Sequence, residues 1–175
     1  LLALYSFILL SSQLLFNVAY VSGPSLVSQD LTVMRNTIVQ QTNVERDKAG
    51  LKILNDSSQL DLAARAKLED MFSKGYWDHK APDGTEAWSF IAKQDYSYIY
   101  AGENLAKGFL NGESTVKAWM ESPTHRKNIL NDKYFDIGVA VGQGTFNDRP
   151  TIFVVQLFAA PETLIASEKV NKIES

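Results

Sequence analysis

The stretch Phe135-Asp136-Ile137-Gly138-Val139-Ala140-Val141 decides the fold class of this chain. Its larger apolar side chains stand at every second position, which is typical of a strand with one buried face. A second stretch, from Thr151 to Phe158, is almost entirely apolar, as expected of a strand that is covered on both faces. The segment between them, from Gln143 to Pro150, is rich in turn-forming residues and is expected to be a loop. The sequence therefore predicts a sheet in its C-terminal half that other elements cover.

Helical spacing of apolar residues fills the chain before these strands. Helices are expected over residues 31–48, 57–75 and 86–94, and a fourth follows the turn at Asn111-Gly112. Pro123 disfavours helical geometry at Ser122, so the fourth helix is expected to end there and a new one to begin with Ser122 as its N-cap. Because helices precede strands instead of alternating with them, the predicted fold class is α+β.

The bulk composition excludes several classes of function. A chain of 175 residues with 45% apolar residues has room for one domain and an appendage. A net charge of −3, without a basic cluster, argues against binding to nucleic acid, which requires neutralisation of phosphates. The chain has no cysteine, which excludes disulfides, a thiolate metal site and a cysteine nucleophile.

The N-terminal part predicts a location outside the cytoplasm. Residues 1–29 carry no charge, and the apolar stretch over residues 1–22 is long enough for a helix that enters the membrane. It is longer than the core of a typical signal peptide, which favours an uncleaved anchor, with cleavage and secretion as the alternative. A linker over residues 23–30, a domain over 31–161 and a C-terminal tail over 162–175 are expected to follow.

The chain has only two histidines, and both lie in turn-rich segments flanked by aromatic residues. His79 follows the expected end of the second helix, His125 falls in the first turn of the helix that begins at Ser122, and Glu103 lies between them in the sequence. Imidazoles and carboxylates that meet in space can hold a transition metal or transfer protons. The helix dipole at the start of a helix disfavours a charged imidazole and so favours the neutral His125 that a metal needs.

Structural roles are the alternative at each of these positions. His79 could be a hydrogen-bonding residue beside Trp77, and His125 could bond the backbone at the start of its helix. Glu103 could cap a turn, and Glu121 could pair with a nearby arginine. Asn104, Ser122 and Arg126 are interpreted as scaffold, and the aromatic residues as core or cleft wall; these are Tyr76, Trp77, Trp88 and Trp119.

Further segments accompany the two histidines in a fixed order. They are Thr42-Asn43-Val44-Glu45-Arg46, Leu60-Asp61-Leu62-Ala63-Ala64-Arg65-Ala66, Pro82-Asp83-Gly84, Gly102-Glu103-Asn104-Leu105, Ala118-Trp119-Met120-Glu121-Ser122-Pro123-Thr124-His125-Arg126, Ile137-Gly138-Val139 and Val154-Val155-Gln156-Leu157-Phe158. Over about Leu31 to Pro161 the chain resembles the CAP superfamily, which comprises the cysteine-rich secretory proteins, antigen 5 and pathogenesis-related 1 proteins and is also called the SCP-like domain. The cysteine-free form resembles the bacterial branch. The resemblance implies an α-β-α sandwich with a central antiparallel sheet, here preceded by a hydrophobic N-terminal helix.

The resemblance also implies a cavity with two histidines and two glutamates. By motif position these are His79, Glu103, Glu121 and His125. His79 and His125 would be ligands for zinc or another divalent metal, weakly bound because no third strong ligand is present. Glu103 and Glu121 would orient the imidazoles or poise a bound water.

Three functions follow from this resemblance. The first is a non-enzymatic, extracytoplasmic module that binds a small ligand, a lipid or a component of the cell envelope in the cleft. The second is a metal-assisted hydrolase in which Glu103 and Glu121 are the candidate catalytic residues. The third is an adhesion or interaction domain with a vestigial cleft. A serine nucleophile is disfavoured because Ser122, the nearest candidate to His125, suits an N-cap better.

Overall fold

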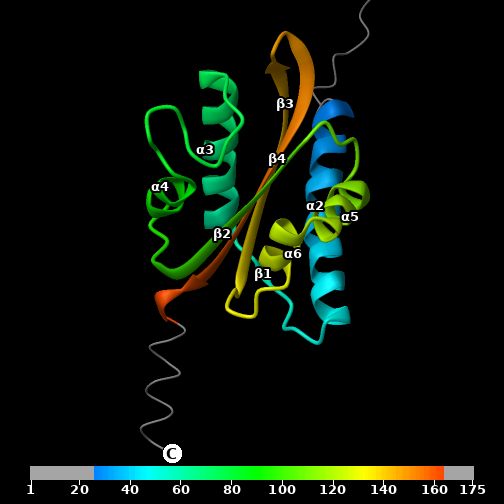
Figure 1. The fold of residues 1–175 in the computed structure, drawn as a ribbon, viewed down its shortest axis with the longest axis vertical. Coiled ribbons are helices and arrows are strands. Elements are labelled where there is room, and N and C mark those ends of the chain that lie inside the picture. Colours follow the sequence, from blue (N-terminus) through cyan, green and yellow to red (C-terminus); the bar gives the residue numbers. More distant parts are fainter. Residues whose placement is uncertain (1–25, 164–175) are drawn as a thin grey trace, which may run out of the picture.

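The structure, a computed structural model, describes residues 26–163, and helices lie on both sides of one sheet (Figure 1). In chain order the elements are α2 (Leu26–Lys48), β1 (Asn55–Asp56), α3 (Ser58–Lys74), α4 (Ala87–Ala92), β2 (Tyr98–Lys107), α5 (Gly112–Glu121), α6 (Pro123–Ile129), β3 (Asp136–Phe146) and β4 (Arg149–Pro161). Helices α3 and α4 lie on one side of the sheet, and α2, α5 and α6 lie on the other. The predicted α+β class and the α-β-α sandwich are confirmed.

The predicted N-terminal anchor over residues 1–22 lies outside the described residues, as does most of the tail expected over 162–175. Helix α2 begins at Leu26, so the later part of the segment expected to be a linker is helical. None of the helices within the described range combines the length and apolar character needed to cross a membrane.

The four strands follow the order β1-β3-β4-β2, with β4 in the middle. Strand β4 pairs antiparallel with both β2 and β3, and its residues 153–160 are all buried. The two-residue strand β1 pairs parallel with the start of β3, so the sheet is not wholly antiparallel. The prediction of a loop over residues 143–150 is wrong. Strand β3 continues to Phe146 and β4 begins at Arg149, so a tight hairpin joins them. Asn147 and Asp148 both have positive φ, 49° and 60°, which suits the twist of a two-residue hairpin turn.

Helix α3 has the boundaries that its sequence predicts. Ser57 is its N-cap and accepts a hydrogen bond from the Leu60 amide, and Gly75 ends it in the left-handed conformation with φ of 66°. The helix packs directly on β3, because three glycines of the strand face it, Gly138, Gly142 and Gly144. A Cβ at Gly138 would overlap the backbone of α3 at Leu60 and Asp61. These missing side chains let the helix approach the strand closely.

We expect the two substitutions Gly138→Ala and Gly142→Ala to differ in cost. The added methyl of Gly138→Ala meets main-chain atoms of α3, which cannot move without displacing the helix. At Gly142 it meets Cδ2 of Leu68 at 2.7 Å, the end of a side chain that can rotate. Urea unfolding should therefore give a loss of about 3 kcal/mol for Gly138→Ala and about 1 kcal/mol for Gly142→Ala. Equal losses would contradict the close backbone contact at Gly138.

Candidate functional site

A histidine and a buried carboxylate form the centre of the site. His79 lies in the loop between α3 and α4, and its Nδ1 is 2.5 Å from Oε1 of Glu103 in β2. The Glu103 side chain is 2% exposed, whereas that of His79 is 62% exposed. The hydrogen bond from the imidazole to this carboxylate raises the pKa of His79, against the opposing effect of partial burial. His79 therefore carries positive charge at a higher pH than an ordinary histidine does.

A fully buried lysine holds the loop that carries His79. Nζ of Lys67, on the inner face of α3, donates to the carbonyls of Asp78 at 3.0 Å and His79 at 2.9 Å, and to the hydroxyl of Tyr76 at 3.1 Å. Burial lowers the pKa of Lys67, and the charge of Glu103 opposes that shift. Lys67 was not among the predicted site residues. The sequence pattern that could have identified Lys67 is its position on the apolar face of an amphipathic helix, four residues before Met71.

His125 lies in the first turn of α6, as predicted, and its environment is different. Its Nδ1 is 2.8 Å from Oγ of Ser122. Ser122 occupies the expected N-cap position, but its hydroxyl makes no capping bond to the backbone. Burial lowers the pKa of His125, and the nearby charge of His79 lowers it further. Two adjacent imidazoles thus have pKa values shifted in opposite directions.

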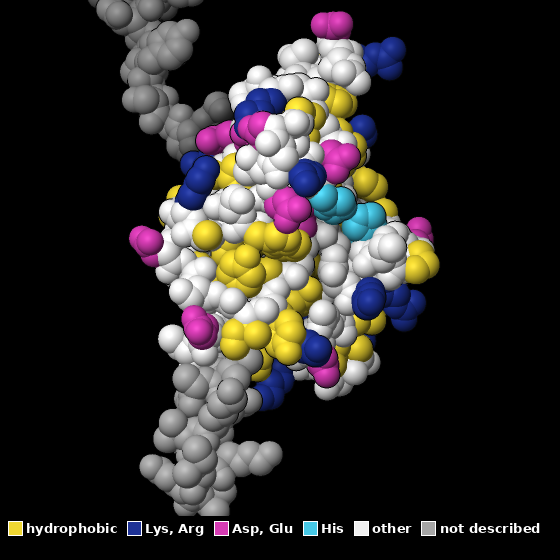
Figure 2. Space-filling model, turned by 60° about the vertical axis from the view of Figure 1, so that its left-hand side comes forward, with side chains coloured by type: hydrophobic (Ala, Val, Ile, Leu, Met, Phe, Trp, Pro, Cys, Tyr) yellow, Lys and Arg dark blue, Asp and Glu magenta, His cyan; other side chains and the backbone are white. Residues whose placement is uncertain are grey.

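The two histidines lie next to each other on one face of the domain (Figure 2). In each of them Nδ1 is engaged, by Glu103 in His79 and by Ser122 in His125. Their Nε2 atoms make no hydrogen bond within the described part of the chain. Each ring is therefore oriented by a neighbour while one nitrogen is left available for a ligand.

Buried amides fix the position of α6 beside β2. Nδ2 of Asn128 donates to the carbonyl of Glu103 and to Oδ1 of Asn104, both at 2.9 Å. Nδ2 of Asn104 donates to Oε1 of Gln156 at 3.0 Å and to the carbonyl of His125 at 3.3 Å. Asn104 thus links the segments that carry Glu103 and His125. Asn128 was not identified from the sequence, since a single asparagine in a short helix gives no pattern.

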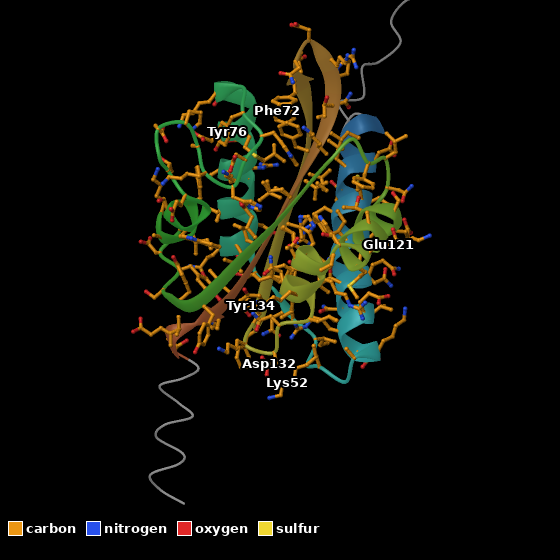
Figure 3. The ribbon with its side chains drawn as sticks, viewed as in Figure 1. Lys52, Phe72, Tyr76, Glu121, Asp132 and Tyr134 are labelled. Atoms are coloured by element: carbon orange, nitrogen blue, oxygen red, sulfur yellow. The ribbon has the colours of Figure 1, made fainter. Side chains whose placement is uncertain are left out.

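The fourth predicted member of the set, Glu121, does not touch the other three. It is the last residue of α5, is exposed, and lies on the side of the domain opposite to Tyr76 and α3 (Figure 3). Across residues 26–163 it makes no hydrogen bond or ion pair, including with Arg126. The structure therefore brings His79, Glu103 and His125 together, and the role of Glu121 stays a prediction.

A pocket of about 340 Å³ lies beside the His79–Glu103 pair. Glu86, Trp88 and Asn128 also line it. Oε2 of Glu103 is buried and has no hydrogen-bond partner. A buried carboxylate oxygen without a donor is costly, because it has lost water and gained nothing in return. Glu103 lines the pocket, so this unpaired acceptor lies in the pocket wall.

The donor atoms near the two histidines limit what a metal ion could bind. Within residues 26–163, no three acidic or histidine side chains are placed to hold one ion together. His79 and His125 can supply two nitrogen ligands, which fits part of a zinc sphere and leaves the rest to water or a bound ligand. A serine-protease arrangement does not fit: no carboxylate bonds the second nitrogen of His125 in the described structure.

The aromatic residues divide into core and cleft wall. Trp119 is 2% exposed and its indole N–H donates to the Leu105 carbonyl at 3.1 Å, and Tyr76 is also buried. Trp77 packs on Phe153 with ring centroids 4.7 Å apart. Trp88 lines the pocket beside Glu103.

Comparison with known proteins identifies similar chains. The model of the CAP family, described as the cysteine-rich secretory protein family, matches residues 39–158. The protein YkwD of Bacillus subtilis is 45% identical over 118 residues, which cover 67% of this chain and 44% of that protein. The chain spans less than half the length of the curated relatives it matches.

Solved structures agree with this match. An extracellular protein of Bacillus anthracis that contains an SCP domain has a TM-score of 0.64 and 25% identity, over 76% of this chain and 42% of that chain. An outer surface protein of Borrelia burgdorferi has a TM-score of 0.62 and 26% identity, over 73% of this chain and 92% of that chain.

Proposed function

The chain belongs to the CAP family of cysteine-rich secretory proteins, and from that premise we propose that it is a ligand-binding module that acts outside the cytoplasm. The observation that carries the proposal is the buried Oε2 of Glu103, which has no hydrogen-bond partner beside an open pocket. A ligand with a hydroxyl or ammonium group would supply the missing donor. Trp88 offers an apolar surface against which the rest of such a ligand packs.

The size and charge of the pocket narrow the class of ligand. A volume of about 340 Å³ is at the small end of ligand sites and suits a small molecule or the head group of a lipid or envelope component. The cationic side chains in the described lining are His79, whose proton is directed at Glu103, and Lys80, which pairs with Glu86 at 3.7 Å. A polar ligand with at least one hydrogen-bond donor therefore fits better than a purely anionic one.

Binding is tested with the full chain and probes that carry such donors: glucosamine, glycerol 3-phosphate and a short-chain phosphatidylethanolamine. Amide chemical-shift changes should concentrate at residues 101–103 and around Trp88. The Glu103→Gln variant should bind about tenfold more weakly, since it replaces a charged acceptor with a neutral amide. Glu69 of α3 offers a matched control, because it is exposed and does not line the pocket, so Glu69→Gln should bind as the wild type does. Equal binding by Glu103→Gln and wild type would contradict the proposal.

We place the domain outside the cytoplasm, anchored or secreted. The uncharged apolar stretch over residues 1–22 supports this, and similar structures are described as an extracellular protein and an outer surface protein. Protease added to intact cells should digest the domain, or the domain should be found in the culture medium. Complete protection until the cells are lysed would contradict this location.

A divalent metal would be held by His79 and His125, with the remaining ligands from water or from the bound molecule. When bound, zinc would act as a Lewis acid toward that molecule. Titration with zinc should show one weak site that is abolished in His79→Ala and in His125→Ala. Because Glu103 orients His79, Glu103→Gln should weaken binding by about tenfold or more. Glu121→Gln should change it little, since Glu121 touches neither imidazole.

The pH dependence of zinc binding follows from the two histidines. A metal requires neutral imidazoles. The raised pKa of His79 means that protons compete for it already above its ordinary value of 6.5, while the lowered pKa of His125 keeps that ring neutral. Zinc affinity should therefore begin to fall at a pH above 6.5 and should keep falling as the pH is lowered further. No binding of zinc, copper or nickel at neutral pH would make the cluster a structural hydrogen-bond network.

A further inference from the structure

The outer edge of β3 is only partly covered. Strand β1 pairs only with Asp136 and Ile137. The strand ends there because the chain continues into α3. The next outward amide, that of Val139, donates to Oδ1 of Asp61 at 2.7 Å. Arg35 of α2 also binds this carboxylate, at 2.6 Å, so the helices on the two sides of the sheet are joined across the edge at this point.

Beyond Val139 the edge has no such partner. The residues of an antiparallel strand alternate between those bonded to the neighbouring strand and those that face away from it. The amide of Val139 bonds Asp61 and not β4, so Val141 and Gln143 also direct their N–H and C=O groups outward. Neither has a hydrogen bond on that side from the described part of the chain. Val141 is half-buried and Gln143 is exposed.

The sequence of helix α3 explains why the outward amide of Val139 has a hydrogen-bond partner and that of Val141 has none. It runs alongside β3, with Leu60 over Gly138 and Leu68 over Gly142. One helical turn advances about 5.4 Å and two strand residues about 6.7 Å, so Arg65 comes beside Val141 as Asp61 comes beside Val139. A carboxylate accepts the Val139 amide, but a guanidinium has no acceptor atom for the amide of Val141. Arg65 therefore leaves the Val141 amide without an acceptor.

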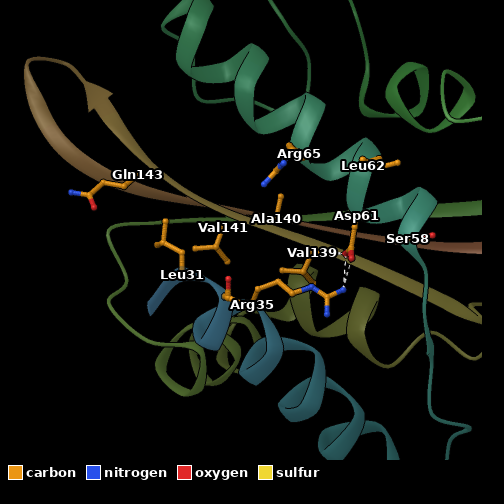
Figure 4. A pocket seen from close by; sticks show the side chains of 11 residues that line it. Leu31, Arg35, Ser58, Asp61, Leu62, Arg65, Val139, Ala140, Val141 and Gln143 are labelled. Atoms are coloured by element: carbon orange, nitrogen blue, oxygen red, sulfur yellow. Dashed lines mark hydrogen bonds and ion pairs between the residues drawn. The ribbon is translucent and has the colours of Figure 1, made fainter. Parts of the chain in front are cut away.

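These groups lie in a groove of about 740 Å³ between α2 and α3 (Figure 4). We call it the β3 edge groove and define it by Leu31, Arg65, Val141 and Gln143. Leu31 extends into it from α2 and Arg65 from α3. Arg65 is exposed and makes no hydrogen bond or ion pair with any other described residue. No residue of the pocket beside Glu103 lines this groove.

We propose that the β3 edge groove binds an extended peptide segment that carries an acidic side chain and adds a strand to the sheet beside Val141 and Gln143. Its backbone would pair with the open N–H and C=O groups of the edge, the mode of recognition known as β-strand addition. Its acidic side chain would pair with Arg65, the unpaired charge of the groove. A second copy fits less well, because pairing two equivalent edges brings two Arg65 side chains of like charge together.

The test uses the full chain and a fluorescein-labelled peptide of about six residues, in which valine and threonine alternate around one central glutamate. Fluorescence anisotropy should show saturable binding. The substitution Gln143→Pro removes an N–H that faces the groove and leaves the bonds to β4 intact. It should weaken binding by about tenfold, whereas Gln143→Ala, which keeps the N–H, should bind as the wild type does.

The proposed ion pair between Arg65 and the peptide is tested by removing the charge of either partner. Arg65→Gln should weaken binding of the glutamate peptide by about fivefold and leave unchanged that of a peptide with glutamine at the same place. Thermal unfolding of each variant checks that it folds. If Gln143→Pro does not fold, slowed hydrogen exchange at the Val141 and Gln143 amides of the wild type on addition of peptide is the deciding measurement.

Four outcomes would overturn the proposal, and the first three concern peptide binding. They are absence of peptide binding to the wild type, equal binding by Gln143→Pro and Gln143→Ala, and preference for a lysine peptide over the glutamate peptide. Self-association that Gln143→Pro abolishes would also overturn it, since the occupant would then be a second copy of the chain.

Discussion

The contact of α3 with the glycines of β3 is the constraint on which the other features depend. Because Gly138 has no side chain, the backbone of Leu60 and Asp61 reaches the strand. The same approach places Asp61 against the Val139 amide at the outer edge and turns Lys67, on the inner face of the helix, toward the loop of His79. A larger residue at Gly138 would displace the helix and move both groups together. The close contact at Gly138 thus determines both the partner of the Val139 amide and the position of the loop that carries His79.

The two buried charged residues beneath His79 lower the stability of the domain but hold His79 in a fixed position. Lys67 is fully buried without a direct carboxylate partner, and its ammonium is satisfied by two carbonyls and the Tyr76 hydroxyl. Glu103 is nearly as buried, and one of its oxygens is unpaired. Apolar residues of similar size would cost less in stability. What the two charges provide is a fixed loop and a fixed ring orientation, so that His79 presents its second nitrogen while remaining largely exposed.

Much of the fold was predictable because it rests on local patterns. The alternation in β3, the apolar run of β4 and the caps of α3 are each visible within a few residues. The hairpin at Asn147 and Asp148 was missed because Gly144, one of the residues that make 143–150 look like a loop, lies instead against Phe72 of α3. In the site, family motifs indicated His79, Glu103 and His125, while Lys67 and Asn128 act through contacts between distant segments. The pairing of Ser122 with His125 was considered and set aside, because an N-cap serine normally bonds the backbone, which this one does not.

The opposite pKa shifts of the two histidines have separate structural origins. His79 has a carboxylate partner from β2, and His125, which is half-buried, has a neutral hydroxyl partner from the start of its own helix. The charge of His79 then acts on its neighbour and lowers the pKa of His125 further. A cluster with one charged and one neutral imidazole can donate a proton from one ring and offer a lone pair from the other at the same pH. That asymmetry suits a polar ligand with both donor and acceptor groups, and it arises because only one of the two rings lies within reach of Glu103.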